Sequence, residues 1–480
     1  MRRHLAALAC AAVLALPACM VGPQYARPQT PAPPAHRFAE GASTDSSLAD
    51  VPWWDVMRDP VLQKLVREAL AANPDLRAAA ARVAEARAQY GIARSALFPQ
   101  VNAAAGYEAR QGARLAEPPQ GTAAGKHFQN YSVGFPITWE IDFFGRVRST
   151  KQAAFAAYLA TEEGRRAAVL TLVSDVASTY LLLRELDLQL EVARRTVGAN
   201  DETVKFYQRR LEGGVSNRLE LDRAQANRAR TGAVIPQLEQ QVAVAEHALS
   251  FLLGRPPGEI ERGEALAEGH VPEAIPVGLP AALLERRPDV LAAEQQLVAA
   301  NANVGAARAL FFPTISLTGL LGSVSGELKS LLKADANVWQ VSPSLFAPIF
   351  QGGRIRRNYE ASRARYDQVA ALYQKAALDA YREVANALVT VRKLGQARLE
   401  LEDGVEALKD AVDLSRKRYD AGLASYLEVL NADQQLFDQE LQLAQVRGEE
   451  LRAYVELYRA LGGGWQDERT PAEAASVPAR

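Results

Sequence analysis

The sequence is poor in the residues that build disulfide frameworks and soft-metal sites. Among 480 residues there are two cysteines, Cys10 and Cys19, and three methionines. The five histidines are scattered, and the HExxH, paired CxxC, Walker and GxSxG patterns are missing from the sequence. We therefore expect a protein that is not an enzyme, needs no cofactor and holds no metal ion.

The sequence also lacks an excess of one charge and long apolar runs. The formal net charge at pH 7 is −1, which offers no basic surface for nucleic acid. Beyond the N-terminus, no stretch has the roughly 18 uninterrupted apolar residues that a transmembrane helix needs. We expect no nucleic-acid partner, and membrane attachment by some means other than a spanning helix.

The N-terminus has the pattern of a secretory signal. Arg2 and Arg3 precede an apolar stretch over 5–16 that is too short to span a bilayer. The next letters, LPAC, resemble the bacterial lipoprotein cleavage box, which implies that residues 1–18 are removed and that Cys19 is acylated. Because Cys10 lies inside the signal, Cys19 would be the only cysteine of the mature chain and would have no disulfide partner within it. Acylation would explain this lone cysteine. An ordinary signal peptide with a chance cysteine is the alternative.

A lipid on Cys19 would anchor the chain without a transmembrane helix. Met20 follows the cysteine in place of an acidic residue, which in such lipoproteins fits sorting to the outer membrane. Much of the segment 19–60 is rich in proline, alanine and serine, so we expect a lipid-anchored strap with no core of its own.

The rest of the chain consists of two copies of an internal repeat. The segment Asn73–Val101 aligns with Arg287–Ile315 at an offset of 214 positions, as in Pro99 and Pro313. Further on, Gly145 aligns with Gly353 and Gly214 with Gly422, both at an offset of 208. The first copy therefore carries about six extra residues between Pro99 and Gly145, which we expect in a loop.

Each copy changes its periodicity twice. An alanine-rich helical pattern ends at Pro99 or Pro313, and an alternation of apolar and polar residues follows, most clearly over 131–143. A strict heptad then begins, which predicts a coiled coil. Its positions are Val169, Val176, Leu183, Leu190, Val197, Val204 and Leu211 in the first copy, and Ala377, Val384, Val391, Val405, Val412 and Tyr419 in the second, interrupted by Arg398.

The predicted organisation is mainly α with a membrane β-barrel. Repeat 1 (61–255) contains a helix, a hairpin at about 100–143, a long helix over 146–211 and a return helix over 219–252. A connector (256–280) leads to repeat 2 (281–465), with a helix, a hairpin at about 314–350, a long helix over 354–419 and a return helix over 426–461. Residues 466–480 form a flexible tail. At 1.5 Å per residue, each long helix spans roughly 100 Å.

Two hairpins supply four strands, and four strands cannot close a barrel. An open sheet in lipid would leave unsatisfied backbone groups at its edges. Several chains must therefore share one barrel; a dimer would give eight strands and a filled interior, and a trimer twelve strands and a passage. We expect the trimer.

Several segments together resemble the TolC-like outer-membrane efflux factors, in the lipoprotein branch that serves resistance–nodulation–division pumps. They are CMVGPQY, VPWWDVMRDPVLQKLVREALAANPDL, the duplicated ALFP and GRVR/GRIR, YDAGLASYLEVLNADQQL and LYRALGGGW. The resemblance covers nearly all the mature chain. It implies a homotrimer with a 12-stranded barrel in outer-membrane lipid and a periplasmic α-helical tunnel, docked on a periplasmic membrane-fusion adaptor and an inner-membrane pump.

The two turns after the long helices are expected at the periplasmic end of this tunnel. Gly422 is followed by Ser425 and Glu428, a capping box, and Gly214 by Asn217 and Glu220, a less perfect one. The minimal interpretation is that these tips only reverse the chain. The functional interpretation adds adaptor docking through Arg210, Gly214, Val215, Ser216, Gly422, Leu423, Ala424 and Ser425.

The resemblance also implies a periplasmic gate inside the second turn. A leucine ring and an acidic ring of relatives fall on Leu427 and Asn431, and Asn431 departs from the aspartate of that branch. Leu219, Asp222 and Arg223 are the candidate gate residues of the first copy, where Asp222 and Arg223 offer ionic contacts.

The expected function is a passive exit duct for drugs or other small toxic compounds. Three methionines give no soft-metal track, so organic cargo is favoured over copper or silver. Two alternatives stay open: a polypeptide-secretion duct of the same architecture, and a non-conducting coiled-coil lipoprotein, which leaves the amphipathic hairpins unexplained.

Overall fold

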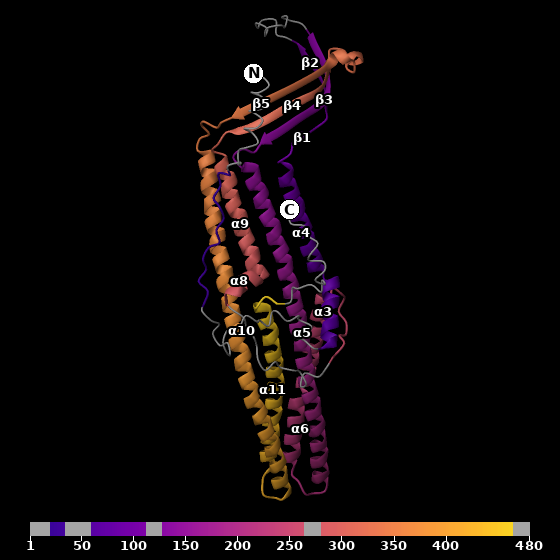
Figure 1. Ribbon diagram of the computed structural model, residues 1–480. Coiled ribbons are helices and arrows are strands. Elements are labelled where there is room, and N and C mark those ends of the chain that lie inside the picture. The colour runs from indigo at the N-terminus through magenta and orange to yellow at the C-terminus, as the bar shows by residue number, and fades with distance from the viewer. Residues whose placement is uncertain (1–19, 34–58, 112–126, 264–279, 464–480) are drawn as a thin grey trace. The chain divides into compact units, whose positions relative to one another are not determined.

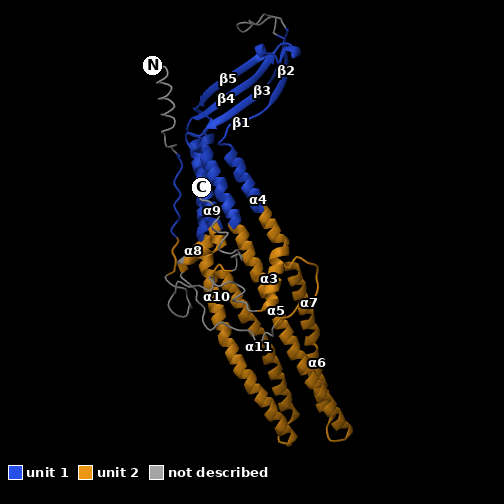
Figure 2. Cartoon of the chain, turned by 45° about the vertical axis from the view of Figure 1, so that its right-hand side comes forward, with its two compact units in different colours: residues 1–29, 82–162, 292–374 blue, residues 30–81, 163–291, 375–480 orange. Residues whose placement is uncertain are grey.

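The computed structural model describes residues 20–33, 59–111, 127–263 and 280–463. The expected signal at 1–18, Cys19 and the tail at 466–480 lie outside the described residues, as do parts of the strap and the connector. The described chain is mainly helical with one antiparallel sheet (Figure 1). It divides into two compact units, coloured separately in Figure 2.

Unit 1 comprises residues 1–29, 82–162 and 292–374 and contains the sheet. The strands are β1 (Gln100–Val101), β2 (Ala104–Gln111), β3 (His127–Ile141), β4 (Thr314–Ser325) and β5 (Asn337–Phe346). Both β1 and β2 pair with β3, so they act as one interrupted strand. Strands β3, β4 and β5 follow in order, all antiparallel. The two expected hairpins thus form one sheet of four strand positions.

The strand register gives this sheet two different faces. Tyr131 lies opposite Tyr107 on β2 and Ser325 on β4, and Phe135 lies opposite Leu321, which lies opposite Trp339. Because side chains alternate along a strand, the odd-numbered residues of all these strands share one face. That face carries Val133, Phe135, Ile137, Trp139, Ile141, Ile315, Leu317, Leu321, Trp339, Val341 and Leu345. The other face is more polar and carries Ser132, Thr138, Glu140, Ser316, Thr318, Gln340, Ser342 and Ser344, together with the apolar residues Phe128, Leu320, Val324, Val338 and Phe346.

Unit 2 comprises residues 30–81, 163–291 and 375–480. The helices of the chain are α3 (Pro60–Ala72), α4 (Pro74–Ser95), α5 (Arg146–Glu212), α6 (Arg218–Gly232), α7 (Val234–Leu252), α8 (Leu283–Arg286), α9 (Pro288–Ala309), α10 (Arg354–Asp420) and α11 (Tyr426–Ala460). Four of them, α4, α5, α9 and α10, have residues in both units. The two long helices, α5 and α10, each have 67 residues.

The predicted heptad positions form much of the core of unit 2. Val176 and Leu183 on α5 and Val384 on α10 are fully buried, in one apolar cluster with residues of α3, α7 and α11. An 18-residue window of α5 is apolar enough to cross a membrane by length and composition, but half of it is buried inside the protein. The core explains this apolar window without a membrane, because a helix buried on several sides is apolar on several sides.

We predicted one return helix over 219–252, and this prediction was wrong. It is interrupted at Ala233, between α6 and α7. Pro236 lies in the first turn of α7, where its missing N–H cannot continue the hydrogen bonding of α6. The equivalent residue of the second copy is Ala444, and α11 runs through it without a break.

The helix expected at the start of each copy is also divided. α3 ends before Pro74, and the side chain of Asn73 accepts hydrogen bonds from the backbone N–H groups of Asp75 and Leu76 at the start of α4. In the second copy the division falls at Arg287, before Pro288. In both copies proline begins the new helix, because its fixed φ suits the first turn.

Candidate functional site

The two turns that end the long helices have the same backbone geometry. Gly214 and Gly422 adopt φ angles of 73° and 74°. The N–H of Val215 donates to the carbonyl oxygen of Arg210 at 2.9 Å, and the N–H of Leu423 donates to that of Arg418 at 2.9 Å. This closure around a left-handed glycine satisfies carbonyl groups that the helix end leaves free. The repeated glycines thus produce two turns with the same backbone conformation.

We predicted a better helix cap after the second turn than after the first, and this prediction was wrong. Asn217 caps α6, because its side chain accepts from the backbone N–H of Glu220 at 3.1 Å. Ser425 makes no side-chain capping bond to α11. The Glu428 carboxylate lies 3.9 Å from the Arg418 guanidinium, and no hydrogen bond returns from it to Ser425, so the reciprocal box is not formed. The first copy therefore has the better cap.

An aromatic cluster joins the tips of the two copies inside unit 2. Tyr207, near the end of α5, is buried and its ring lies 4.4 Å from that of Tyr426, at the start of α11. Tyr419 of α10 is 6.2 Å from Tyr207 and 6.1 Å from Tyr426. Ala224, Val429 and Leu430 complete the buried part. We define this set of residues as the tip cluster.

Sequence reasoning missed the tip cluster, although a signal was present. Tyr207 lies three residues after the heptad residue Val204, at the complementary inward position. The three tyrosines are not equivalent under the 208-residue repeat, since Tyr207 corresponds to Ser415 and Tyr426 to Arg218. An aromatic contact between unequal positions of two repeats has no periodic pattern in the sequence.

Arg210, which we predicted as a docking residue, takes part in the contact between the tips. Its guanidinium lies over the ring of Phe206 at 5.4 Å and over that of Tyr419 at 5.8 Å. It also donates to the carbonyl oxygen of Val215 at 3.4 Å. These contacts hold the charge of Arg210 against aromatic faces, where it links the copies.

The other predicted docking and gate residues are largely at the surface of the described chain. Gly214, Val215, Gly422, Leu423 and Ser425 are exposed, while Ser216 and Ala424 are half-buried. Leu219 and Leu427 are exposed and occupy equivalent positions on α6 and α11, as do Arg223 and Asn431. Asp222 lies 3.6 Å from Arg218, so its partner is not its neighbour Arg223.

Polar contacts tie the two copies together immediately beyond the tip cluster. Asn227 on α6 donates to Asn200 on α5 and accepts from Gln434 on α11 at 3.1 Å. On the other coil, Arg416 donates to Asp433 at 2.9 Å. Burial raises the pKa of the Asp433 carboxyl, and the Arg416 guanidinium offsets this only in part. Of these bonds only the one between Asn227 and Gln434 joins the two copies, so separating the copies would break that bond and leave the other two in place.

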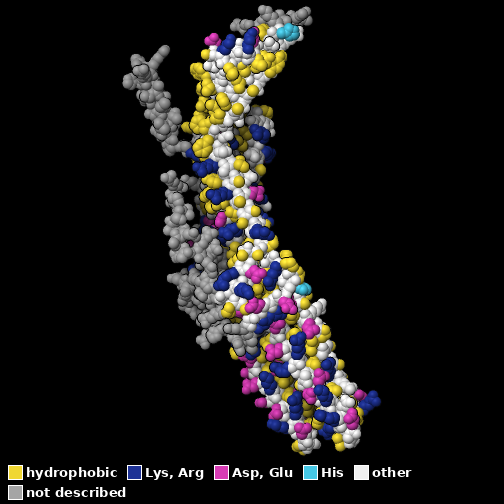
Figure 3. Space-filling view, turned by 90° about the vertical axis from the view of Figure 1, so that its right-hand side faces the viewer, with side chains coloured by type: hydrophobic (Ala, Val, Ile, Leu, Met, Phe, Trp, Pro, Cys, Tyr) yellow, Lys and Arg dark blue, Asp and Glu magenta, His cyan; other side chains and the backbone are white. Residues whose placement is uncertain are grey.

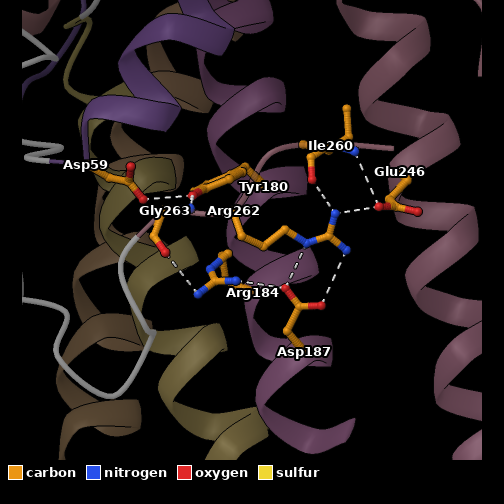
Figure 4. A network of polar contacts seen from close by, with 8 residues as sticks. All are labelled: Asp59, Tyr180, Arg184, Asp187, Glu246, Ile260, Arg262 and Gly263. Carbon is orange, nitrogen blue, oxygen red and sulfur yellow. Dashed lines mark hydrogen bonds and ion pairs between the residues drawn. The ribbon is translucent and has the colours of Figure 1, made fainter. Parts of the chain in front are cut away.

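A second polar network in unit 2 holds the start of α3 and the segment after α7 against α5 (Figure 4). The hydroxyl of Tyr180 donates to Asp59 at 2.8 Å and accepts from the backbone N–H of Gly263 at 2.9 Å. Figure 4 shows the Arg262 guanidinium pointing between Asp187 and Glu246, with which it forms ion pairs. Nothing in the periodicity of the sequence indicated this network.

The described part of the strap follows α9 within unit 1. The carbonyl oxygen of Pro23 accepts from Asn301 at 3.0 Å, and Tyr25 donates to Glu294 at 3.1 Å. Arg27 forms a two-point ion pair with the same Glu294 carboxylate. Gly305 permits the close approach of the strap, since a Cβ there would meet the backbone of Gly22. The strap is thus fixed along 22–27.

No group of three or more His, Cys, Asp or Glu side chains with metal-binding geometry occurs within residues 20–33, 59–111, 127–263 and 280–463. Two ion pairs in unit 2 join helices through buried carboxylates. Arg452 pairs with Glu185, and Arg398 pairs with Glu450 at 2.8 Å, where each carboxylate is buried. Arg398 interrupts the heptad for this reason.

The chain matches the family described as Outer membrane efflux protein over residues 65–255 and 279–463. It is 35% identical to the solvent efflux pump outer membrane protein SrpC of Pseudomonas putida, over 95% of this chain and 97% of that protein. It is 34% identical to the cation efflux system protein CusC of Escherichia coli O6:H1, over 94% and 97%. The solved open state of the Neisseria gonorrhoeae outer membrane channel MtrE superposes with a TM-score of 0.84 at 32% identity, over 94% of this chain and 100% of that one. The chain therefore belongs to the outer membrane efflux protein family and is the outer-membrane component of an efflux system.

Proposed function

We propose that three copies of this chain form one 12-stranded barrel in the outer membrane and a helical tunnel in the periplasm. The trimer is a passive exit duct that receives cargo from a periplasmic adaptor and an inner-membrane pump of the resistance–nodulation–division class. The observation that carries this proposal is the two-faced sheet, whose edge strands β5 and β1/β2 have no second partner among the described strands. Further copies would pair these edges and close the barrel.

The apolar face of the sheet has the dimensions of a membrane-spanning band. It extends over eleven residues of β3, from Tyr131 to Ile141, whose ten intervals span roughly 33 Å along the strand. At the usual barrel tilt of about 40° this corresponds to a height of about 25 Å, the thickness expected for the lipid-facing band. Hydrophobic side chains gather over the sheet in Figure 3, and charged ones over the helices of unit 2.

The fixed course of the strap supports a lipid anchor at Cys19. Met20 contacts Gly145, where β3 has ended and α5 is about to begin. The lipid proposed on the preceding residue would therefore be attached near this end of the sheet. We place the inner boundary of the membrane here.

The exposed turn residues are suited to contact an adaptor, and the tip cluster is suited to keep the duct narrow. Six tips in a trimer, two from each chain, would surround the periplasmic opening. Organic compounds are the favoured cargo, because three methionines provide no path of soft donors for copper or silver. The names of the relatives include both solvent and cation efflux.

Drug susceptibility tests this function directly. The chain is expressed with candidate adaptor and pump pairs in a strain that lacks its own outer-membrane duct. We expect resistance to organic antibiotics and solvents to return with a cognate pair and to stay absent with the duct alone. Purified protein that remains monomeric in detergent and in membranes would contradict the proposal.

Leu427→Ala should make the duct more conductive. The Leu427 side chain is 42% exposed in the single chain, so it is available to meet its symmetry mates across the opening. Shortening it widens that constriction without removing a buried contact. Conductance in planar bilayers should rise, while the equivalent change Leu219→Ala tells whether the first copy narrows the same passage. Unchanged conductance of Leu427→Ala would exclude a gate at this residue.

Gly422→Val should abolish export while leaving the trimer intact. A Cβ at Gly422 would meet no atom within 4 Å, so the expected damage comes only from the positive φ, which a β-branched residue tolerates poorly. Gly422→Asn is the matched control, because asparagine accepts this conformation more readily. Export by Gly422→Val equal to that of Gly422→Asn would show that the tip geometry is not required.

A further inference from the structure

A cavity of about 640 Å³ lies between the β2–β3 hairpin and the turn that joins β4 to β5. Its walls include Tyr107 and Tyr131, whose ring centroids are 4.9 Å apart, and three leucines of the turn, Leu328, Leu331 and Leu332. This volume is in the range of cavities that hold a small ligand. We call it the rim cavity.

The leucines of the turn are unusually exposed for a connection between strands. Leu328 is 65% exposed and Leu332 is 88% exposed. Turns between strands are normally polar, and apolar side chains grouped at a surface indicate a partner. The turn around them carries Glu327, Lys329, Lys333 and Asp335, which cancel in charge, and Lys329 pairs with Glu327 at 3.1 Å. The partner is therefore selected by apolar contact and not by charge.

The rim cavity continues the apolar face of the sheet. Tyr107 and Tyr131 lie opposite each other in the strand register and share the face that carries Phe135 and Leu321. If that face contacts the lipid of a membrane, a ligand in the cavity contacts the same lipid. Tyrosine is also enriched at the boundary between the apolar region of a membrane and water, where its ring is buried and its hydroxyl is wet.

We infer that the rim cavity binds an acyl chain of a lipid in the outer leaflet of the outer membrane. This inference rests on the proposed barrel, because the apolar face must be in contact with lipid for the chain to enter. The two tyrosine rings form one wall, and Leu331 and Leu332 close over the chain. The bound lipid fixes the β4–β5 turn at the boundary between lipid and water.

Lipid retention by the purified trimer tests the inference. The full-length protein, its Leu331→Asp variant and the control Leu372→Asp are equilibrated with dimyristoyl phosphatidylcholine in mild detergent and weighed by native mass spectrometry. Leu372 is also an exposed leucine of unit 1, but it lies on α10 outside the sheet. Wild type and Leu372→Asp should retain up to three lipids per trimer more than Leu331→Asp. Equal retention by all three would overturn the inference, and Leu331→Ser replaces Leu331→Asp if the latter does not assemble.

Fluorescence quenching identifies the occupant of the cavity. A Leu332→Trp variant is placed in lipid bilayers with brominated acyl chains, and an Asp335→Trp variant serves as the control on the same turn. Emission from the added tryptophan at 332 should be quenched at least twofold more than that at 335. Equal quenching would mean that another copy of the chain covers the turn, and would overturn the inference. A protein that restores drug resistance but shows equal quenching refutes only the lipid site, whereas failure to form trimers refutes the proposed function.

Discussion

Channels that carry Tyr207→Ala should conduct far more than wild-type channels at low voltage. Tyr207 is 3% exposed and forms the centre of the tip cluster, with Tyr426 of the second copy at 4.4 Å. Truncating a buried aromatic side chain typically costs about 3 kcal/mol or more. The contact exists only while the tips are packed together, so its loss destabilises the packed state alone. The equilibrium constant between packed and separated tips then shifts by about 100-fold toward separation. Single-channel conductance and sensitivity of cells to a large antibiotic would both report the change.

Phe206→Ala is the matched control for Tyr207→Ala. Phe206 is the adjacent aromatic residue, but it is 39% exposed; its ring lies 5.2 Å from that of Tyr207 and 5.4 Å from the Arg210 guanidinium, and it does not contact the second copy in the tip cluster directly. Removing it should have a much smaller effect on conductance. If both variants conduct like wild type while remaining trimeric, the tip cluster does not hold the opening closed.

Arg398→Leu should destabilise the protein by about 3 kcal/mol, although it completes the heptad of α10. The change leaves the carboxylate of Glu450, whose side chain is 3% exposed, without its partner at 2.8 Å. Breaking a buried ion pair by removing one member costs more than replacing both members with apolar residues. The reverse single change, Glu450→Val, should cost less, because Arg398 keeps its second partner Glu402 at 2.9 Å.

The equivalent residues of the first copy suggest a double variant that replaces both members of the ion pair. At the offset of 208 positions, Arg398 and Glu450 correspond to Leu190 and Val242, which pack in the core of unit 2. Arg398→Leu combined with Glu450→Val should therefore recover most of the loss. The midpoint of thermal unfolding of the detergent-solubilised trimer measures each variant. Additive losses in the double variant would show that the pair is not coupled.

The periodic parts of the fold could be predicted because their patterns depend only on the spacing of residues along the chain. Heptads at Val176, Leu183 and Val384 marked the buried face of α5 and α10, and alternation over 131–143 marked β3, which ends two residues earlier at Ile141. Glycines at 214 and 422 marked the turns, since few other residues adopt a positive φ. In each case a residue type and its spacing carry the structural information without knowledge of a distant partner.

The contacts between the copies could not be predicted in the same way. Arg398 looked like an interruption until Glu450 provided its charge partner from another helix. Ser425 and Glu428 had the pattern of a capping box, yet the Glu428 carboxylate lies near Arg418, and Asn217 makes the better cap. The capping prediction failed because a local pattern competes with partners that are distant in sequence.

By itself, the sequence determined the duplication, the long helices, the two hairpins and the two tight turns, because each depends on residues within a few turns or strands. Only the tertiary structure decided that Tyr207 meets Tyr426, that Tyr180 joins Asp59 to Gly263, and that Arg27 of the strap binds Glu294. These contacts depend on how helices and strands pack. Packing brings together side chains whose separation along the chain carries no repeating signal.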